Sequence, residues 1–283
     1  MTMFGQHFNR LTTDLNQRFL TAPVVEATKW QSTNAPQAMV ELFNMSFTLP
    51  LDTEDLDTYR EAIKPNLPWA DRHFEEERVS GEPINPGETW KIWPFARSAA
   101  AHLREGENIE QYDHSYAERY WPKYAGLTSD GHLPGGKPEE GDFSGTGPCA
   151  GIRFEIGDLD DVVQVLADDP LTRQGYLPIY YPEDVAAARD SKRVPCTLGY
   201  HFIQRFGQFH LVYPMRSCDY IRHWRDDVYL TIRLQLWVLD RLREIDPETW
   251  GSVTPGTFRM HMTSLHMFTS DRENLRYQMR NRA

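Results

Sequence analysis

The 283-residue sequence has only three cysteines, and they are not spaced as metal ligands. Neither a CxxC nor an HExxH spacing occurs in the chain. An odd number of cysteines without a secretory leader argues against a disulfide framework. The missing spacings argue against a structural or catalytic zinc ion. We therefore expect a protein with neither a metal cofactor nor a disulfide scaffold.

Phosphate-binding glycine signatures, long apolar runs and excess positive charge are also missing. Without GxGxxG or GxxxxGK[ST], a dinucleotide fold or a P-loop has no support. No uncharged apolar run is long enough to cross a bilayer, and the first 19 residues lack the apolar core of a signal peptide. The net charge of −11 disfavours general nucleic-acid binding. These absences predict a cytoplasmic protein that binds neither a membrane nor nucleic acid directly, although a few arginines could still hold a small anion.

Aromatic residues are plentiful, with 8 Trp, 13 Tyr and 14 Phe, and they predict a substantial core. Strand-like and helix-like segments are mixed without strict alternation, which favours one large mixed β-sheet flanked by helices in an α/β (α+β) fold. We expect a single domain over residues 1–283, with a long Gly/Pro-rich loop at about 127–151. The expected strands cover residues 22–32, 38–49, 175–184, 194–217 (a hairpin turning near RFGQ) and 256–268. The expected helices cover residues 51–63, 68–81, 157–170 and 226–246.

The segment VPCT places Cys196 in an apolar stretch, where a cysteine is usually an inert core residue. The segment PMRSCD belongs to the next strand of the same expected hairpin, which would bring Arg216 close to Cys196. A neighbouring guanidinium favours the thiolate, which is the nucleophilic form of cysteine. From these residues alone, Arg216 could equally cap a strand end at the surface, and Arg173 in DPLTRQG could be a solvated loop charge.

The segments DPLTRQG, VPCT, MRSCD, RDDVY and SLHMF, in this order, resemble the thymidylate synthase superfamily. Within it, the chain resembles most the phage deoxycytidylate (dCMP) 5-hydroxymethyltransferases, and GETWKIW and VLDRL also fit that pattern. The resemblance runs from about residue 24 to residue 268 and is most specific after Asp169. It implies a folate-dependent enzyme, working as a homodimer on a pyrimidine nucleoside monophosphate, in the host cytoplasm if a phage encodes it.

In this family Cys196 would be the nucleophile that adds to C6 of the pyrimidine and activates C5. Arg216 and Ser217 match the Arg-Ser pair that binds the 5′-phosphate. Arg173 matches the first of two arginines that reach the phosphate across the dimer interface, while the second position is Gln174. Lys29 is a further candidate for the phosphate.

Asp219 matches the aspartate that holds the pterin of 5,10-methylenetetrahydrofolate, the expected co-substrate. His223 departs from the pattern, because the family usually has glycine there. Trp90 and Trp93 would flank the folate and the base, or else pack in the core. Tyr116 stands where the family has a pocket tyrosine.

Asp227 stands where thymidylate synthases have an asparagine that reads uracil. A carboxyl group can accept from the cytosine N4 amine and, if protonated, donate to N3, so Asp227 favours cytosine. The other interpretation is that Asp227 or Asp226 caps the helix that begins here. His266 matches the histidine that contacts the sugar 3′-hydroxyl, and Phe268 replaces a family tyrosine.

A general acid/base glutamate is expected in HFEEERVSG, where Glu77 is the first choice and Glu75 the second; Glu76 is the remaining candidate. At least one of the three should belong to a solvated face. The leading hypothesis is a dCMP 5-hydroxymethyltransferase. The alternatives are a CMP hydroxymethylase, a dUMP hydroxymethylase or methylase, and an inactive nucleotide-binding dimer.

Overall fold

A computed structural model describes residues 2–27, 37–96, 104–105, 110–123, 157–190 and 192–280. Lys29, Cys149 and the Gly/Pro-rich segment at 127–151 lie outside the described residues. Within the described part of the chain, no helix is long and apolar enough to cross a membrane.

Six strands form one sheet in the order β1-β2-β8-β7-β6-β5. Their bounds are β1 Val24–Ala27, β2 Gln37–Pro50, β5 Tyr176–Pro178, β6 Gly199–Arg205, β7 Gln208–Asp219 and β8 Thr254–Phe268. Neighbouring strands are antiparallel except β7 and β8, which run parallel. The sheet is therefore mixed, as predicted. A separate pair joins β3 Arg104–Glu105 to β4 Glu110–Gln111.

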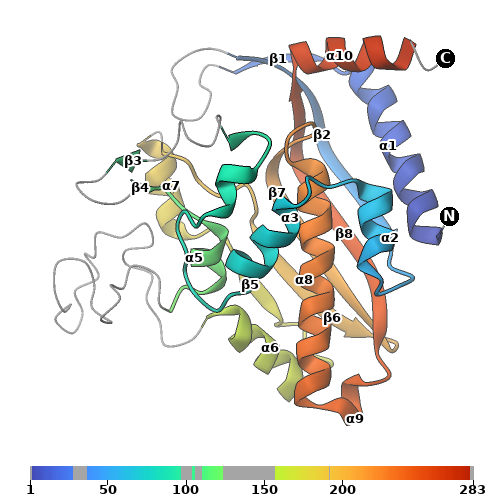
Figure 1. Ribbon diagram of the computed structural model, residues 1–283, viewed down its shortest axis with the longest axis vertical. Helices are drawn as coiled ribbons and strands as arrows, with labels where there is room; N and C mark the ends of the chain where they lie inside the picture. Colours follow the sequence, from blue (N-terminus) through green and yellow to red (C-terminus); the bar gives the residue numbers. More distant parts are fainter. Residues whose placement is uncertain are drawn as a thin grey trace.

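The longest helix, α8 (Trp224–Ile245), runs along the sheet, and the shorter helices flank it (Figure 1). Its apolar positions recur every three or four residues, and all five that the sequence pattern identified are buried: Val228, Ile232, Leu236, Leu239 and Leu242. The other helices are α1 Met3–Thr21, α2 Leu56–Ile63, α3 Trp69–Arg72, α5 Tyr116–Tyr120, α6 Leu159–Asp168, α7 Pro182–Arg189, α9 Pro247–Trp250 and α10 Thr269–Arg280, with a 3₁₀ turn η2 at Thr89–Ile92.

The predicted hairpin is present as β6 and β7, joined by Phe206 and Gly207. Both turn residues have positive φ, 53° and 72°, as a tight two-residue hairpin turn requires. The prediction that Cys196 lies within the strand is wrong, because β6 begins only at Gly199. Cys196 precedes it in an irregular stretch, next to an isolated bridge between Thr197 and Met215.

Two other predicted elements differ in extent. The helix expected over 68–81 consists of α3 followed by a π-helical turn, η1 (His73–Arg78), and the chain then leaves it towards Gly81, whose φ is 86°. The strand expected over 175–184 is short, because α7 begins at Pro182, a residue that fits the first turn of a helix.

The parallel pair β7–β8 contains one irregularity. Phe209 is opposite Pro255, whereas Leu211 is opposite Phe258, so β8 has one extra residue at this point. After the bulge the pairing is regular and ends with Asp219 opposite His266.

Candidate active site

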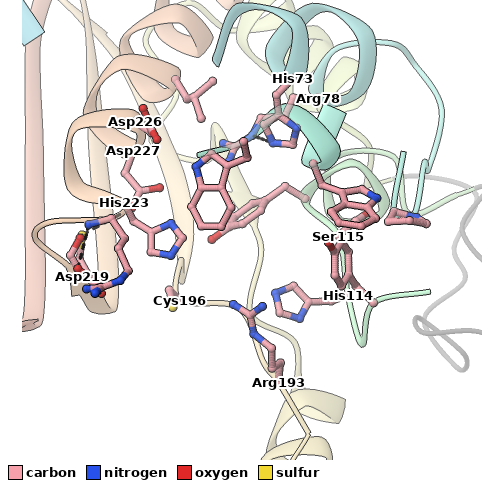
Figure 2. Close-up of a pocket in the computed structure, with 18 of the residues that line it drawn as sticks. His73, Arg78, His114, Ser115, Arg193, Cys196, Asp219, His223, Asp226 and Asp227 are labelled. Atoms are coloured by element: carbon pink, nitrogen blue, oxygen red, sulfur yellow. Dashed lines mark hydrogen bonds and ion pairs between the residues drawn. The ribbon is translucent and has the colours of Figure 1, made fainter. Parts of the chain in front are cut away.

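A cavity of about 270 Å³ opens where β7 ends and α8 begins. Its other walls are η1, η2, the segment 112–117 and the stretch before β6. Nine of the residues to which the sequence assigned a catalytic or binding role line it: Glu77, Trp90, Trp93, Tyr116, Cys196, Ser217, Asp219, Asp227 and His266. Figure 2 shows Asp219, His223 and Asp227 on one side of Cys196, with His114 and Arg193 on the other. Segments far apart in the chain therefore converge on one partly enclosed space.

Cys196 is half-buried beside the guanidinium of Arg216. The Arg216 amide donates to the Cys196 carbonyl at 2.9 Å, and Arg216 Nη2 lies 3.9 Å from Cys196 Sγ. The guanidinium also donates to the carbonyls of Pro195 and Val194, at 2.9 and 3.1 Å, which fixes its position. Ser217 Oγ is 3.9 Å from the same sulfur. Nucleophilic cysteines are typically found in such partly exposed, electropositive settings.

Asp227 lies in the first turn of α8, and its carboxyl group accepts from Cys218 Sγ at 3.6 Å. Burial raises the pKa of Asp227 to about 7; the positive charge of Arg78 works against this rise and the negative charge of Asp226 adds to it. Neither aspartate caps the helix, because the cap residue is His223, which makes no side-chain cap bond, and Asp226 accepts from Asn66 instead. The capping interpretation is therefore wrong, and a carboxyl group that can change protonation near neutral pH faces the cavity.

Asp219 ends β7 with both carboxylate oxygens engaged. One accepts from the amides of Ile221 and Arg222, at 2.9 and 3.0 Å, and the other from Arg222 Nη1 at 3.1 Å. Arg222 also pairs with Asp271 at 2.7 Å and lies over the Phe268 ring, 4.7 Å from its centroid. Three of the roughly four acceptor positions of the Asp219 carboxylate are therefore occupied, and one on the second oxygen remains for another donor.

At position 223, where the family usually has glycine, the imidazole of His223 packs against Trp93. The two rings are stacked with centroids 4.9 Å apart, and burial lowers the pKa of His223 to about 4. Trp90 and Trp93 both line the cavity, so they offer aromatic surface to a flat ligand.

Among the three consecutive glutamates, Glu77 is the one that faces the cavity; its side chain is 6% exposed. Its carboxylate lies 2.7 Å from His73 Nδ1 and accepts from the Thr89 amide at 2.8 Å. Burial opposes ionisation, but these bonds outweigh it and hold the pKa of Glu77 below its ordinary value. Glu75 is 62% exposed and pairs with Arg233, while Glu76 pairs with Arg72. The placement counts against Glu75 as an acid/base group, because its carboxylate points away from the cavity.

Of the remaining predicted residues, His266 and Tyr116 lie at the cavity, whereas Arg173 lies outside it. His266 is buried beside Asp219, and burial lowers its pKa. The hydroxyl groups of Tyr116 and Thr197 are 2.9 Å apart. Arg173 is exposed and does not line this cavity, and its carbonyl lies 3.0 Å from His201 Nε2. A role for Arg173 at the same site would have to come from a second subunit.

Among the cavity residues that sequence reasoning missed are His73, Arg78, His114 and Arg193. His73 and Arg78 flank the glutamates in HFEEER, so a histidine and an arginine in the segment expected to supply the acid/base group were the available signal. Arg193 directly precedes VPCT. Among the described residues, no group of three His, Cys, Asp or Glu side chains could hold a metal ion.

Neither a protein-family model nor a curated protein matches this chain. Among solved structures, the chain is similar to the thermostable thymidylate synthase A from Bacillus subtilis, with a TM-score of 0.52 and 14% sequence identity. The similarity covers 99% of this chain and 84% of that one. At this identity it shows the fold alone, which is thymidylate synthase-like, as predicted.

Proposed function

We propose that this protein transfers a one-carbon unit from 5,10-methylenetetrahydrofolate to the cytosine C5 of dCMP and, with water, forms 5-hydroxymethyl-dCMP and tetrahydrofolate. The observation that carries this proposal is the pairing of Cys196 and Asp227 in one cavity of a thymidylate synthase-like fold. The first residue is suited to activating a pyrimidine ring, and the second to choosing cytosine over uracil.

Cys196 is the proposed nucleophile. Its thiolate adds to C6 of the base, and the electron pair of the C5–C6 bond makes C5 nucleophilic. C5 bonds to the one-carbon unit, which the folate supplies at the oxidation level of formaldehyde. C5 then loses its proton, and the bond between the one-carbon unit and the folate nitrogen breaks, which releases tetrahydrofolate. Water adds to the resulting exocyclic methylene, and the C6–S bond breaks to release Cys196. No net oxidation or reduction occurs, so the reaction needs no redox partner.

Asp227 is the proposed reader of the base. Cytosine presents a donor at N4 and an acceptor at N3, and a protonated carboxyl group complements both. Because burial raises the pKa of Asp227 to about 7, the protonated form is available near neutral pH. Uracil presents O4 and N3–H, and an acceptor oxygen facing O4 would be repelled.

The phosphate is assigned to Arg216 and Ser217, with Arg173 contributed by a second copy of the chain and Lys29 as an additional candidate. Arg216 already holds two carbonyls beside Cys196, so it would bring the phosphate and the nucleophile to one point. His266 is assigned to the sugar. Gln174 is neutral, so the phosphate would meet one positive charge fewer than with a second arginine at this position.

The folate is assigned to the aromatic wall of Trp90 and Trp93, with Tyr116 nearby and Asp219 as the pterin acceptor. Glu77 is assigned to the attacking water. The aromatic wall fits a flat ligand, and Asp219 keeps one acceptor position beside its bonds to Arg222 and the backbone amides.

The test is the product mass after incubation with methylenetetrahydrofolate and dCMP, CMP or dUMP in parallel. A gain of one CH₂O on dCMP alone supports the proposal, and Cys196→Ser is the matched control that should abolish it. The same gain on CMP alone would move the substrate to a ribonucleotide, an alternative that Phe268 leaves open, because its ring carries no hydroxyl group for the sugar.

Release of tritium from [5-³H]dCMP separates an active enzyme from a binding protein. Exchange that depends on Cys196 requires the C6 adduct. Nucleotide binding without exchange or product would instead favour an inactive nucleotide-binding dimer.

A further inference from the structure

Three side chains of the π-helical turn η1 form a hydrogen-bonded row at the wall of the cavity. His73 Nδ1 lies 2.7 Å from Glu77 Oε2, and Arg78 Nε donates to His73 Nε2 at 3.0 Å. The wider π turn, marked by the bond from the Val79 amide to the Phe74 carbonyl, places residues four and five positions apart beside the same ring. One histidine can therefore contact both neighbours at once.

The chemistry of the partners fixes the proton on the imidazole. An arginine side chain can only donate, so His73 Nε2 must be the accepting nitrogen. The proton of the neutral ring is then on Nδ1 and is donated to Glu77. Burial lowers the pKa of His73, which keeps the ring neutral. With the opposite tautomer, a lone pair of Nδ1 would face a lone pair of the carboxylate.

Arg78 is unusual for a buried cation. The residue is 4% exposed, and among the described residues no carboxylate oxygen lies within 4.0 Å of its guanidinium nitrogens. Its contacts are His73, the Tyr120 hydroxyl at 3.5 Å and the ring of Tyr116, 4.4 Å from the guanidinium carbon. Burying a charge without a charged partner is costly, so a purely structural residue here would more often be apolar.

Other titratable groups surround this row. Asp226 and Asp227 face Arg78 from α8, and the hydroxyl groups of four tyrosines face it from α5, β6 and β7: Tyr116, Tyr120, Tyr200 and Tyr213. Arg72 and Glu76 lie on the exposed side of the same turn. Among the described residues, His73 is the titratable side chain that hydrogen-bonds to the Glu77 carboxylate.

We propose that His73 and Arg78 are positioning residues for Glu77: Arg78 fixes the Nδ1–H tautomer of His73, and this tautomer holds the Glu77 carboxylate ionised and aimed into the cavity. The catalytic part of this inference rests on the proposed function, in which Glu77 orders the attacking water. The positioning part does not, since it concerns the protonation of the free protein.

The first measurement needs no substitution. Ring ¹⁵N chemical shifts of His73 in the wild-type protein, assigned with His73→Asn, report which nitrogen carries the proton. We expect a protonated Nδ1 and an unprotonated Nε2 from pH 6 to pH 8. A protonated Nε2, or a doubly protonated ring at pH 7, would overturn the inference.

The second measurement follows the ¹³C shift of the Glu77 carboxyl group with pH, assigned with Glu77→Gln. His73→Phe keeps a ring but removes the donor, and it should raise the pKa of Glu77 by about one unit or more. His73→Asn keeps a donor near the Nδ1 position and should stay close to the wild type. Arg72→Met is the matched control, since it removes a charge from the exposed side of the same turn. An unchanged Glu77 pKa in His73→Phe contradicts the inference.

The third measurement is the pH profile of kcat for hydroxymethylation. His73→Phe and Arg78→Met should lower kcat by about 10- to 100-fold, leave KM for the nucleotide within about twofold and move the acid limb to higher pH. His73→Asn should recover most of the loss. If the wild type makes no product from any nucleotide, the proposed function fails, while the two NMR measurements still decide the positioning of Glu77.

Discussion

Cys196 and Arg216 meet just before the β6–β7 hairpin, where the Arg216 amide donates to the Cys196 carbonyl beside the isolated bridge between Thr197 and Met215. The pairing brings the guanidinium within 3.9 Å of the sulfur and ties it to the two carbonyls that precede the cysteine. The guanidinium is therefore held in place beside the sulfur. A substitution that changes only the sulfur atom tests the chemistry expected of Cys196.

Cys196→Ser replaces sulfur with oxygen and removes the thiolate. We expect hydroxymethylation and C5 tritium release to fall by roughly 10³-fold or more, because a serine hydroxyl at this position has no adjacent base. Nucleotide affinity, measured by calorimetry, should change less than about threefold, since the phosphate contacts remain. Retained exchange would mean that Cys196 is an inert thiol.

Asp227→Asn should change the choice of base. An asparagine donates to O4 and accepts from N3–H, so kcat/KM should fall about 10- to 100-fold for dCMP and rise for dUMP. Competition between the two nucleotides in one reaction, read by mass, measures the change directly. Equal losses on both bases would contradict the role assigned to Asp227.

The same substitution tests the buried carboxyl group without any substrate. A pKa of about 7 in the folded protein, above the ordinary 3.8, means that the folded state binds this proton more tightly than the unfolded state. The stabilising effect of that proton is complete below pH 4 and is lost as the pH rises through 7. Asp227→Asn should therefore gain free energy of unfolding over the wild type between pH 4 and pH 8, by about 1–4 kcal/mol at the upper end.

Urea titrations at pH 4, 6 and 8 check this result. Asp226→Asn is the comparison variant, and it should be destabilising at pH 4, because Asp226 accepts two bonds from Asn66. Burial also raises the pKa of Asp226, so this destabilisation should become smaller as the pH rises. A difference between Asp227→Asn and wild type that does not change with pH would show that Asp227 titrates normally.

At the scale of elements, Glu77 belongs to the π turn η1, and the loop before η2 packs against its carboxylate. The loop approaches so closely that a Cβ on Gly87 would lie 2.2 Å from Glu77 Oε1, and Gly87 has a φ of 75°. The position of the carboxylate thus depends on a glycine ten residues away, as well as on the donors of His73 and Thr89.

Gly87→Ala should displace the Glu77 carboxylate and lower kcat by about 10- to 100-fold while nucleotide binding remains. Gly81→Ala is a matched control: its φ of 86° is equally unfavourable for alanine, but a Cβ there meets nothing within 4 Å. Both variants should lose about 1 kcal/mol of stability, and only Gly87→Ala should lose activity. Equal kcat values for Gly87→Ala and Gly81→Ala would mean that the position of the Glu77 carboxylate does not matter for the reaction.

These elements also mark how far sequence reasoning could go. Helix α8 was predictable, because its buried apolar residues recur every three or four positions. The β6–β7 hairpin was predictable from its local turn. The π turn was not, since HFEEER reads equally well as an ordinary helix, in which the three glutamates fan out at about 100° per residue. Only the packing of Arg233 against Glu75 and of His73 against Glu77 decides which carboxylate faces inward.

For the whole molecule, the exposed position of Arg173 gives the dimer hypothesis a direct test. If the site needs Arg173 from a second subunit, Cys196→Ser and Arg173→Ala are each inactive or weak, but a mixed dimer has one intact site. Half of the dimers in an equal mixture are mixed and carry one working site of two, so mixing after subunit exchange should restore about a quarter of wild-type activity. No restoration in a mixture shown to contain mixed dimers would place Arg173 outside the active site.

The fold class was predicted from the segment order, whereas the shape of the cavity wall around Trp93 and Asp219 was not. The sequence marks His223 as a departure from the family pattern but does not predict its stacking on Trp93. It also does not predict that Arg222, which pairs with the nearby Asp219, reaches Asp271 in a distant segment. Such contacts depend on the complete fold, and no local pattern encodes them.

The extra residue of β8 has a consequence for every position after it. Side chains alternate between the two faces of a strand, so the residues beyond the bulge are one step out of phase with those before it. His266 shares a face with Asp219 only because of this odd count. If β8 kept along its whole length the register that it has before the bulge, Leu265 would come opposite Asp219, and the imidazole of His266 would lie on the other side of the sheet. A single extra residue about ten positions before His266 thus decides which side chain stands beside Asp219 in the cavity.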